Sequence, residues 1–175
     1  MLNKIWAHWK AWASQWQSQR KASHRYRQNA AVHRYNTLAE IQGKNDSETF
    51  ARRIAYLRKL DPLVFEELVL DGFKRQGWLV ERNNRYTGDG GLDGKVFQGN
   101  QWVGIQCKRY KGAIQTAHVN QFCRDLFKFG LTKGYFVHTG KTPTGLRNCH
   151  SQVVILSGQR LIDFLTANEG CKNHG

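Results

Sequence analysis

The sequence is short of long apolar stretches, paired cysteines and acidic residues, and each shortage narrows the classes of protein to consider. No apolar run approaches the ~20 residues of a transmembrane helix, and the first residues lack the apolar core of a signal peptide. The four cysteines form no CxxC pair and have no histidines at zinc-ligand intervals, which argues against common zinc sites and indicates free thiols. We therefore expect a cytoplasmic protein without a transmembrane segment.

Acidic residues are outnumbered by basic ones. Asp and Glu number 13 against 27 Lys and Arg, which gives a net charge of +14 and a pI near 10.0. Such a balance indicates a polyanionic partner, although charge alone does not separate nucleic acid from anionic lipid. The excess is concentrated in residues 1–60, which hold 12 basic and 3 acidic residues, a net charge of 12 − 3 = +9.

Residues 1–59 are predicted to form a basic, tryptophan-rich helical extension, because neither proline nor glycine occurs before Gly43. Its apolar side chains recur at helical spacing: Ile5, Trp6, Trp9, Trp12, Ala13 and Trp16. Three roles stay open for this stripe and the basic residues after it. The stripe packs on the protein itself or on a second copy in a homodimer, the segment binds DNA phosphates, or it lies on a membrane surface. After Gly43, Ser47 is the predicted cap of a short helix that ends at Lys59.

Residues 60–167 are predicted to form one α/β domain, followed by a flexible tail at 168–175. Asp61 and Pro62 begin a helix, since aspartate is a good N-cap and proline suits the first turn. Gly99 and Asn100 are predicted to form the two-residue turn of a hairpin. The later elements are a helix, two strands and a closing helix around residues 119–126, 134–138, 153–156 and 161–165. This order implies a mixed central β-sheet flanked by helices.

Three polar residues on this hairpin carry the chemistry. Side chains two apart on a strand share a face, so Gln106 and Lys108 point together, and the turn places Asp93 beside them. Carboxylate and amide oxygens bind hard divalent cations such as Mg²⁺, and a lysine neutralises charge at a phosphate. The alternative is structural: Asp89 and Asp93 cap glycine-rich turns, and Gln106 and Lys108 form the solvated face of an edge strand.

Four blocks of sequence stand in a fixed order in this part of the chain. They are Phe65-Glu66-Glu67-Leu68-Val69, Gly77-Trp78, Gly88-Asp89-Gly90-Gly91-Leu92-Asp93-Gly94 and Gln106-Cys107-Lys108-Arg109-Tyr110. Together they resemble the catalytic domain of Mrr-type restriction endonucleases, which belong to the PD-(D/E)xK nuclease superfamily. The resemblance covers roughly residues 60–167 and implies a restriction-endonuclease-like core, in a variant with glutamine in place of the usual second acid.

The resemblance also implies roles for individual residues. Asp93 is the metal-binding aspartate, Gln106 the second ligand and Lys108 the catalytic lysine, and the backbone carbonyl of Cys107 completes the metal site. The implied metal is Mg²⁺, with Mn²⁺ as a substitute. The activity implied is that of a Mg²⁺-dependent DNA endonuclease that hydrolyses phosphodiester bonds with metal-activated water. A non-catalytic nucleic-acid-binding protein on the same fold, and a nuclease for repair or junction processing, stay open as alternatives.

The family also places a glutamate near the metal, on the helix that follows Asp61. Glu66 and Glu67 are the two candidates. Glu66 lies about 90° from the centre of the apolar stripe of this helix and Glu67 about 170° from it. We therefore predict that Glu66, which also matches the family position, belongs to the site and that Glu67 faces water.

Four basic residues are predicted to contact DNA. Arg85, Arg109 and Lys111 are expected to clamp the backbone, and Lys141, in the loop after the strand at 134–138, is expected to bind phosphate. For each of them the alternative is a solvated charge or an ordinary turn. The family usually has an aromatic residue and alanines after this loop, and residues 143–147 lack them, so the local DNA contacts of the family are not carried over.

Overall fold

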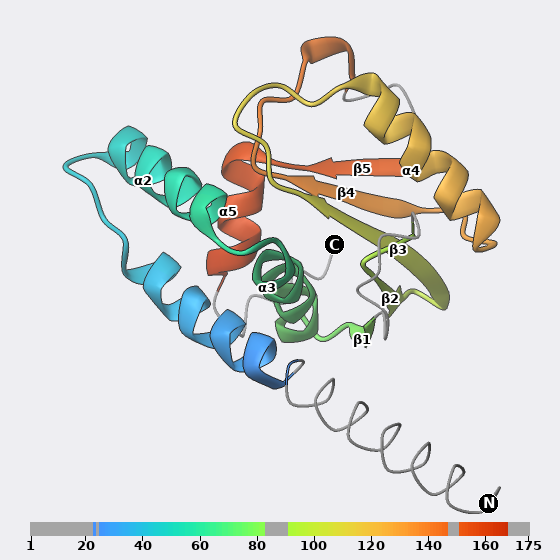
Figure 1. Cartoon of the computed structure of the whole chain (residues 1–175), viewed down its shortest axis with the longest axis horizontal. Coiled ribbons are helices and arrows are strands. Elements are labelled where there is room, and N and C mark those ends of the chain that lie inside the picture. The colour runs from blue at the N-terminus through green and yellow to red at the C-terminus, as the bar shows by residue number, and fades with distance from the viewer. Residues whose placement is uncertain (1–22, 24, 83–90, 147–150, 168–175) are drawn as a thin grey trace, which may run out of the picture.

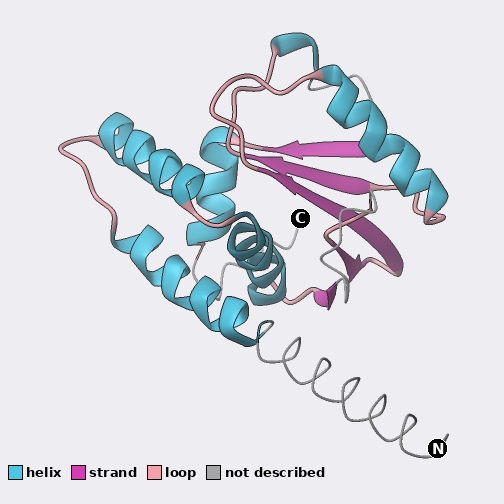
Figure 2. Ribbon diagram, in the orientation of Figure 1, coloured by secondary structure: helices cyan, strands magenta, loops and turns pink. Residues whose placement is uncertain are grey.

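The computed structural model describes residue 23 and residues 25–82, 91–146 and 151–167. The tryptophan stripe and the predicted tail lie outside these residues. The described chain forms a five-stranded sheet flanked by helices (Figures 1 and 2). After a helix at residues 25–40, the elements are α2 (Asp46–Lys59), α3 (Pro62–Arg75), β1 (Leu79–Arg82), β2 (Gly94–Gln98), β3 (Gln101–Lys108), α4 (Thr116–Lys128), β4 (Gly134–His138), the 3₁₀ helix η1 (Thr144–Leu146), β5 (Val153–Leu156) and α5 (Gly158–Thr166). Among the described residues, no helix combines the length and the apolar composition needed to cross a bilayer.

The sheet has the strand order β1-β2-β3-β4-β5. β1, β2 and β3 pair antiparallel, whereas β3, β4 and β5 pair parallel. The mixed central sheet flanked by helices that the sequence predicts is therefore confirmed. The two short apolar runs at residues 134–138 and 153–156 form β4 and β5 with the predicted bounds.

The β2–β3 hairpin closes on the predicted turn. Gly99 and Asn100 have φ angles of 56° and 65°. Glycine and asparagine tolerate this left-handed backbone best, and a two-residue turn that matches the twist of its strands requires it. The turn fixes a register in which Gly94 pairs with Ile105, so Asp93 lies just beyond the last pair of β2 with β3.

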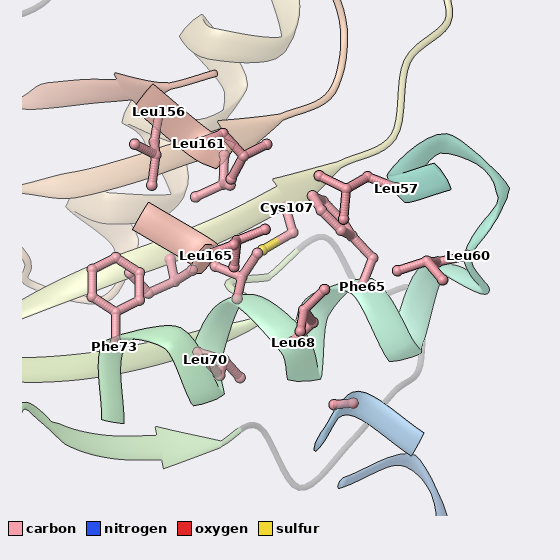
Figure 3. Packing of buried hydrophobic residues seen from close by; sticks show 14 of the residues in the cluster. Leu57, Leu60, Phe65, Leu68, Leu70, Phe73, Cys107, Leu156, Leu161 and Leu165 are labelled. Atoms are coloured by element: carbon pink, nitrogen blue, oxygen red, sulfur yellow. The ribbon is translucent and has the colours of Figure 1, made fainter. Parts of the chain in front are cut away.

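Two hydrophobic clusters hold the helices to the sheet. One joins α2, α3 and α5 to the strands (Figure 3), and the other lies between the strands and α4. In Figure 1, α4 lies on one side of the strands and α3 and α5 on the other. Val103, Ile105 and Cys107 of β3 belong to the first cluster, as strand alternation predicts. The even-numbered residues of β3 therefore face the side of α4.

Part of the basic extension shares the first cluster. Ala31 and Leu38, from the helix at residues 25–40, are buried in it together with Ile54 and Leu57 of α2. These residues pack with α3 and α5, so the described part of the extension contributes to the main hydrophobic core.

The predicted start of α2 is wrong by two residues. The helix begins at Asp46 with Asn45 as its cap, instead of at Glu48 with Ser47 as its cap. Asn45 Oδ1 accepts the N–H of Glu48 at 2.9 Å, and Glu48 Oε2 accepts the N–H of Lys44 at 2.7 Å. This reciprocal arrangement is similar to a capping box and satisfies two main-chain donors, which a serine cap two residues later does not do. The predicted start of α3 is confirmed, since Asp61 Oδ1 accepts the N–H groups of the second and third helical residues.

Candidate active site

Asp93 lies directly before β2 and is fixed on β3 by main-chain contacts. Its N–H donates to the carbonyl oxygen of Ile105 at 2.9 Å. Its Oδ2 accepts the N–H of Cys107 at 2.6 Å, and Gln106 Nε2 lies 3.4 Å from Oδ1 and 3.3 Å from Oδ2. Within the described residues Oδ1 is therefore held only by one long contact, and it is the freer of the two carboxylate oxygens.

Gln106 and Lys108 share the α4 side of β3 but differ in exposure. Gln106 is only 7% exposed, whereas Lys108 is exposed. An amide carries an oxygen at one end and a nitrogen at the other, so a half-turn of the Gln106 amide exchanges Nε2 for Oε1 beside Asp93. Gln106 can therefore present an oxygen donor at the position that its nitrogen occupies in the structure.

Glu66, from the first half of α3, supplies a second carboxylate. Burial, and then the charge of Asp93, raise the pKa of Glu66 to about 8, although Lys108 acts in the opposite direction. Burial also raises the pKa of Asp93 to about 6, against the lowering effects of the Cys107 N–H, Lys108 and Gln106. In the described part of the chain, neither carboxylate forms an ion pair. Two neighbouring carboxylates that ionise with difficulty favour the binding of positive charge between them.

Glu67 is buried, so the prediction that it faces water is wrong. Its side chain is 2% exposed, and its Oε2 lies 2.7 Å from Nε of Arg82 at the end of β1. Helical phase alone places Glu67 on the side of α3 away from the apolar stripe, which would be open to solvent if nothing covered it. Instead the helix at residues 25–40 covers that side, where Gln28, Asn29 and other residues of this helix line a small hollow of about 210 Å³ together with Glu67. Glu67 is thus engaged in an ion pair with β1, and Glu66 is the glutamate close to Asp93.

The four predicted DNA contacts have different surroundings. Lys111 and Lys141 are exposed, and Arg85 lies outside the described residues. Arg109 points into the protein, where its Nη1 donates to the carbonyl oxygen of Arg58 in the last turn of α2 at 3.2 Å and to that of Leu60 between α2 and α3. Through Nη1, Arg109 attaches the end of β3 to the end of α2 and the residue after it. Lys111 and Lys141, by contrast, are open to solvent.

A polar network under the ends of β3 and β4 was not predicted. Arg58 donates from Nε and Nη2 to the carbonyl oxygen of Thr139 at 3.0 and 2.8 Å, and Thr139 Oγ1 lies 3.1 Å from the main-chain N and O of Tyr110. His138, which is fully buried, accepts a main-chain N–H at Nδ1 and lies 3.1 Å from Thr142 Oγ1 through Nε2. The only local signal is the polar pair His138-Thr139 at the end of an apolar strand. Arg58 is 81 residues away from Thr139 in sequence and carries no such signal.

The donor atoms of this site fit a hard divalent cation. Asp93 Oδ1, the Gln106 amide oxygen and the main-chain carbonyl of Cys107 are oxygen donors, and Glu66 adds a second carboxylate. No group of three or more His, Cys, Asp or Glu side chains that suits a metal occurs among the described residues. The fit therefore depends on amide and main-chain oxygens beside two carboxylates.

A mixed sheet that carries an aspartate beside a Gln-x-Lys strand defines a nuclease domain of the restriction-endonuclease type. The Mrr_cat family model, which describes a restriction endonuclease, matches residues 57–165, and the chain belongs to this family. The expected resemblance is thereby confirmed. A solved structure of the restriction endonuclease FokI aligns with 69% of this chain at 12% sequence identity and a TM-score of 0.42. The chain spans 28% of the FokI chain. No curated protein matches the sequence.

Proposed function

We propose that this chain is a Mg²⁺-dependent endodeoxyribonuclease that hydrolyses phosphodiester bonds and accepts Mn²⁺ in place of Mg²⁺. The observation that carries the proposal is the meeting of Asp93 with Gln106 on β3, beside Lys108 and Glu66, where two carboxylates have raised pKa values. Membership of the restriction endonuclease family supports nuclease activity. The net charge of +14 supports a polyanionic substrate such as DNA.

The residues of the site have separate roles in this proposal. Asp93, Gln106 and the carbonyl of Cys107 would hold the cation, which when bound stabilises charge on a phosphate and lowers the pKa of a water molecule. Lys108, exposed at the end of β3, would neutralise the charge that develops on the scissile phosphate. Glu66 would orient the attacking water or accept its proton, since its carboxylate lies close to that of Asp93. Lys111 and Lys141, both exposed, would bind neighbouring phosphates.

Cleavage assays on the full chain test this proposal. The purified protein is incubated with supercoiled, linear, single-stranded and branched DNA, each with Mg²⁺, with Mn²⁺ or with EDTA. We expect cutting with either cation and none with EDTA. Asp93→Ala and Lys108→Ala should each lower the cleavage rate by about 100-fold or more, the usual effect of removing a charged group at the reacting phosphate.

Two control variants test whether the loss of cleavage is specific to Asp93 and Lys108. Asp163→Ala and Lys128→Ala remove exposed side chains of the same charge from α5 and from the last turn of α4, and both variants should cut as the unaltered protein does. Cutting that persists in Asp93→Ala and Lys108→Ala would refute the proposed site. DNA binding without cutting of any substrate would favour the non-catalytic alternative, and preferential cutting of branched DNA would favour junction processing.

A further inference from the structure

Tyr110 and His118 form a side-chain pair beside Lys108 that the proposed mechanism does not use. The Tyr110 hydroxyl lies 2.7 Å from Nδ1 of His118, which is in the first turn of α4. The two rings are stacked, with centroids 5.3 Å apart and an interplanar angle of 28°. Tyr110 packs against the hydrophobic cluster under α4, so it lies on the same side of the sheet as Gln106 and Lys108.

Tyr110 is held rigidly. Thr139 Oγ1 lies 3.1 Å from both its main-chain N and its main-chain O. Gly140 approaches so closely that a Cβ on it would lie 2.8 Å from the Cβ of Tyr110 and 2.4 Å from the carbonyl oxygen of Gly112. The Tyr110 ring therefore offers a fixed position against which His118 is oriented, and this position is tied to the end of the strand that carries Lys108.

Which atom donates in the Tyr110–His118 pair depends on the tautomer of the imidazole. His118 Nδ1 is the only partner of the Tyr110 hydroxyl among the described residues, and donation from the hydroxyl to Nδ1 satisfies its O–H. A neutral histidine that accepts at Nδ1 carries its hydrogen on Nε2. His118 is half-buried, and within the described chain Nε2 has no hydrogen-bond partner. In the tautomer with its hydrogen on Nε2, His118 provides a hydrogen-bond donor of fixed direction beside the proposed active site.

The surroundings of this donor suit an anion. Lys108, Lys111 and Lys141 are exposed, and none of them forms an ion pair in the part of the chain that the structure describes. The loop that carries Lys111 is joined to the loop that carries Lys141, because Ala113 and Lys141 form a parallel β-bridge. Lys108 is the last residue of β3 and Tyr110 follows it by two residues, so Lys108 and the Tyr110–His118 pair come from the same end of this strand.

We propose that Tyr110 orients His118 so that its Nε2–H donates to a DNA phosphate adjacent to the scissile one. His118 is then a binding residue of a second phosphate subsite, and Tyr110 is a positioning residue. This inference rests on the proposed nuclease function and extends it, since it assigns the subsite that places the cleaved strand along the end of β3.

Two amide substitutions at His118 separate a phosphate contact from a purely structural role. In His118→Gln the amide nitrogen lies near the position of Nε2, whereas in His118→Asn it lies near that of Nδ1. Affinity for a short DNA duplex is measured by fluorescence anisotropy on the full chain in an Asp93→Asn background, which is expected not to cut. We expect His118→Asn and His118→Ala to weaken binding about tenfold and His118→Gln to keep most of the affinity. Tyr110→Phe, which keeps the ring but frees the imidazole, should weaken binding less than His118→Ala does.

A modified substrate identifies the contacted phosphate. Single phosphates around the cleavage position are replaced one at a time by uncharged methylphosphonates. One replacement next to the scissile phosphate should weaken binding by the protein with His118 but not by its His118→Ala variant. Equal effects on both proteins at every position, or an affinity preserved in His118→Asn and lost in His118→Gln, would overturn the subsite. If these variants bind like their parent while the unaltered chain still cuts DNA, only the subsite is wrong; if the unaltered chain neither binds nor cuts DNA, the proposed function is wrong.

Discussion

The substitution Asp93→Asn is expected to stabilise the protein while it removes the proposed activity. The Asp93 carboxylate is mostly buried, and burial raises its pKa from 3.8 to about 6. At neutral pH the folded protein therefore holds an ionised group that would be more stable in the unfolded chain. Asparagine has nearly the same shape, and its Oδ1 can accept the N–H of Cys107 that Asp93 accepts at 2.6 Å. The substitution thus removes the unfavourable charge and keeps the main-chain hydrogen bond.

The size of the effect follows from the pKa. A pKa of about 6 in place of 3.8 corresponds to about 3 kcal/mol at neutral pH, since a tenfold change in a dissociation constant is worth about 1.4 kcal/mol. Partial contact with solvent screens the charge, so the expected gain in the free energy of unfolding is about 2 kcal/mol. The folded state binds this proton more tightly than the unfolded state, so the penalty is absent below about pH 3.8 and complete above about pH 6. The advantage of asparagine should accordingly fall to about a fifth near pH 4.

Urea denaturation followed by tryptophan fluorescence measures this effect. The unaltered protein and the variant are compared near pH 4 and near pH 7.5, with and without Mg²⁺. Without Mg²⁺ the variant should be more stable at the higher pH; with Mg²⁺ the unaltered protein should gain stability, by about 2.7 kcal/mol at 100 times the dissociation constant, and the variant should not. Asp163→Asn, at an exposed carboxylate of α5, should change stability by less than about 0.5 kcal/mol. A variant that is less stable than the unaltered protein at both pH values would refute the reasoning.

Three further predictions concern the packing around the site. Glu67→Ala leaves the charge of Arg82 uncompensated and should lower the free energy of unfolding by about 3–5 kcal/mol. Glu81→Ala, at an exposed ion pair, should lower it by less than about 1 kcal/mol, and urea titrations compare the two variants. Gly134→Ala places a Cβ 2.5 Å from the buried ring of Phe122 and should lower the free energy of unfolding by about 1–3 kcal/mol in the same assay. Its control is Gly112→Ala, whose Cβ meets no atom within 4 Å and which should leave stability nearly unchanged. Burial lowers the pKa of His138 from 6.5 to about 4, so its contribution to stability is complete above pH 6.5 and is lost as the pH falls toward 4. His138→Gln should therefore reduce the fall of the melting temperature between pH 6.5 and pH 4, which thermal melting over a series of pH values measures.

Elements that depend on local chemistry were predictable from the sequence. The Gly99-Asn100 turn requires residues that tolerate a positive φ, and these two supply them. Asp61 followed by Pro62 has the composition of a helix start, and the structure contains that cap. The order of Asp93 and Gln106 about this turn was sufficient to predict that they meet, because hairpin register and strand alternation carry the positions of both.

Features that depend on several distant elements were not predictable in the same way. The phase of α3 correctly placed Glu66, which is half-buried, at the border of the buried face, but it gave the wrong surroundings for Glu67. A helical wheel contains no information about a second layer of helix. Arg109 illustrates the same limit. Its position after Lys108 suggests a DNA contact, yet its Nη1 donates to carbonyl oxygens at the end of α2 and just after it, about 50 residues earlier in the chain.

The helix at residues 25–40 accounts for the unexpected burial of Glu67. The family match begins at residue 57, inside α2, so Ala31, Leu38 and Ile54 lie outside it although they are buried in the main cluster. Without them the outer side of α3 would face water, and Glu67 would be the solvated charge that its helical position suggests. Glu67 is instead buried under this helix and paired with Arg82 of β1, and its charge adds to the effects of burial and of Asp93 that raise the pKa of the neighbouring Glu66. A segment outside the family match therefore contributes to the electrostatics of the proposed active site through packing, independently of any contact that its basic residues make with DNA.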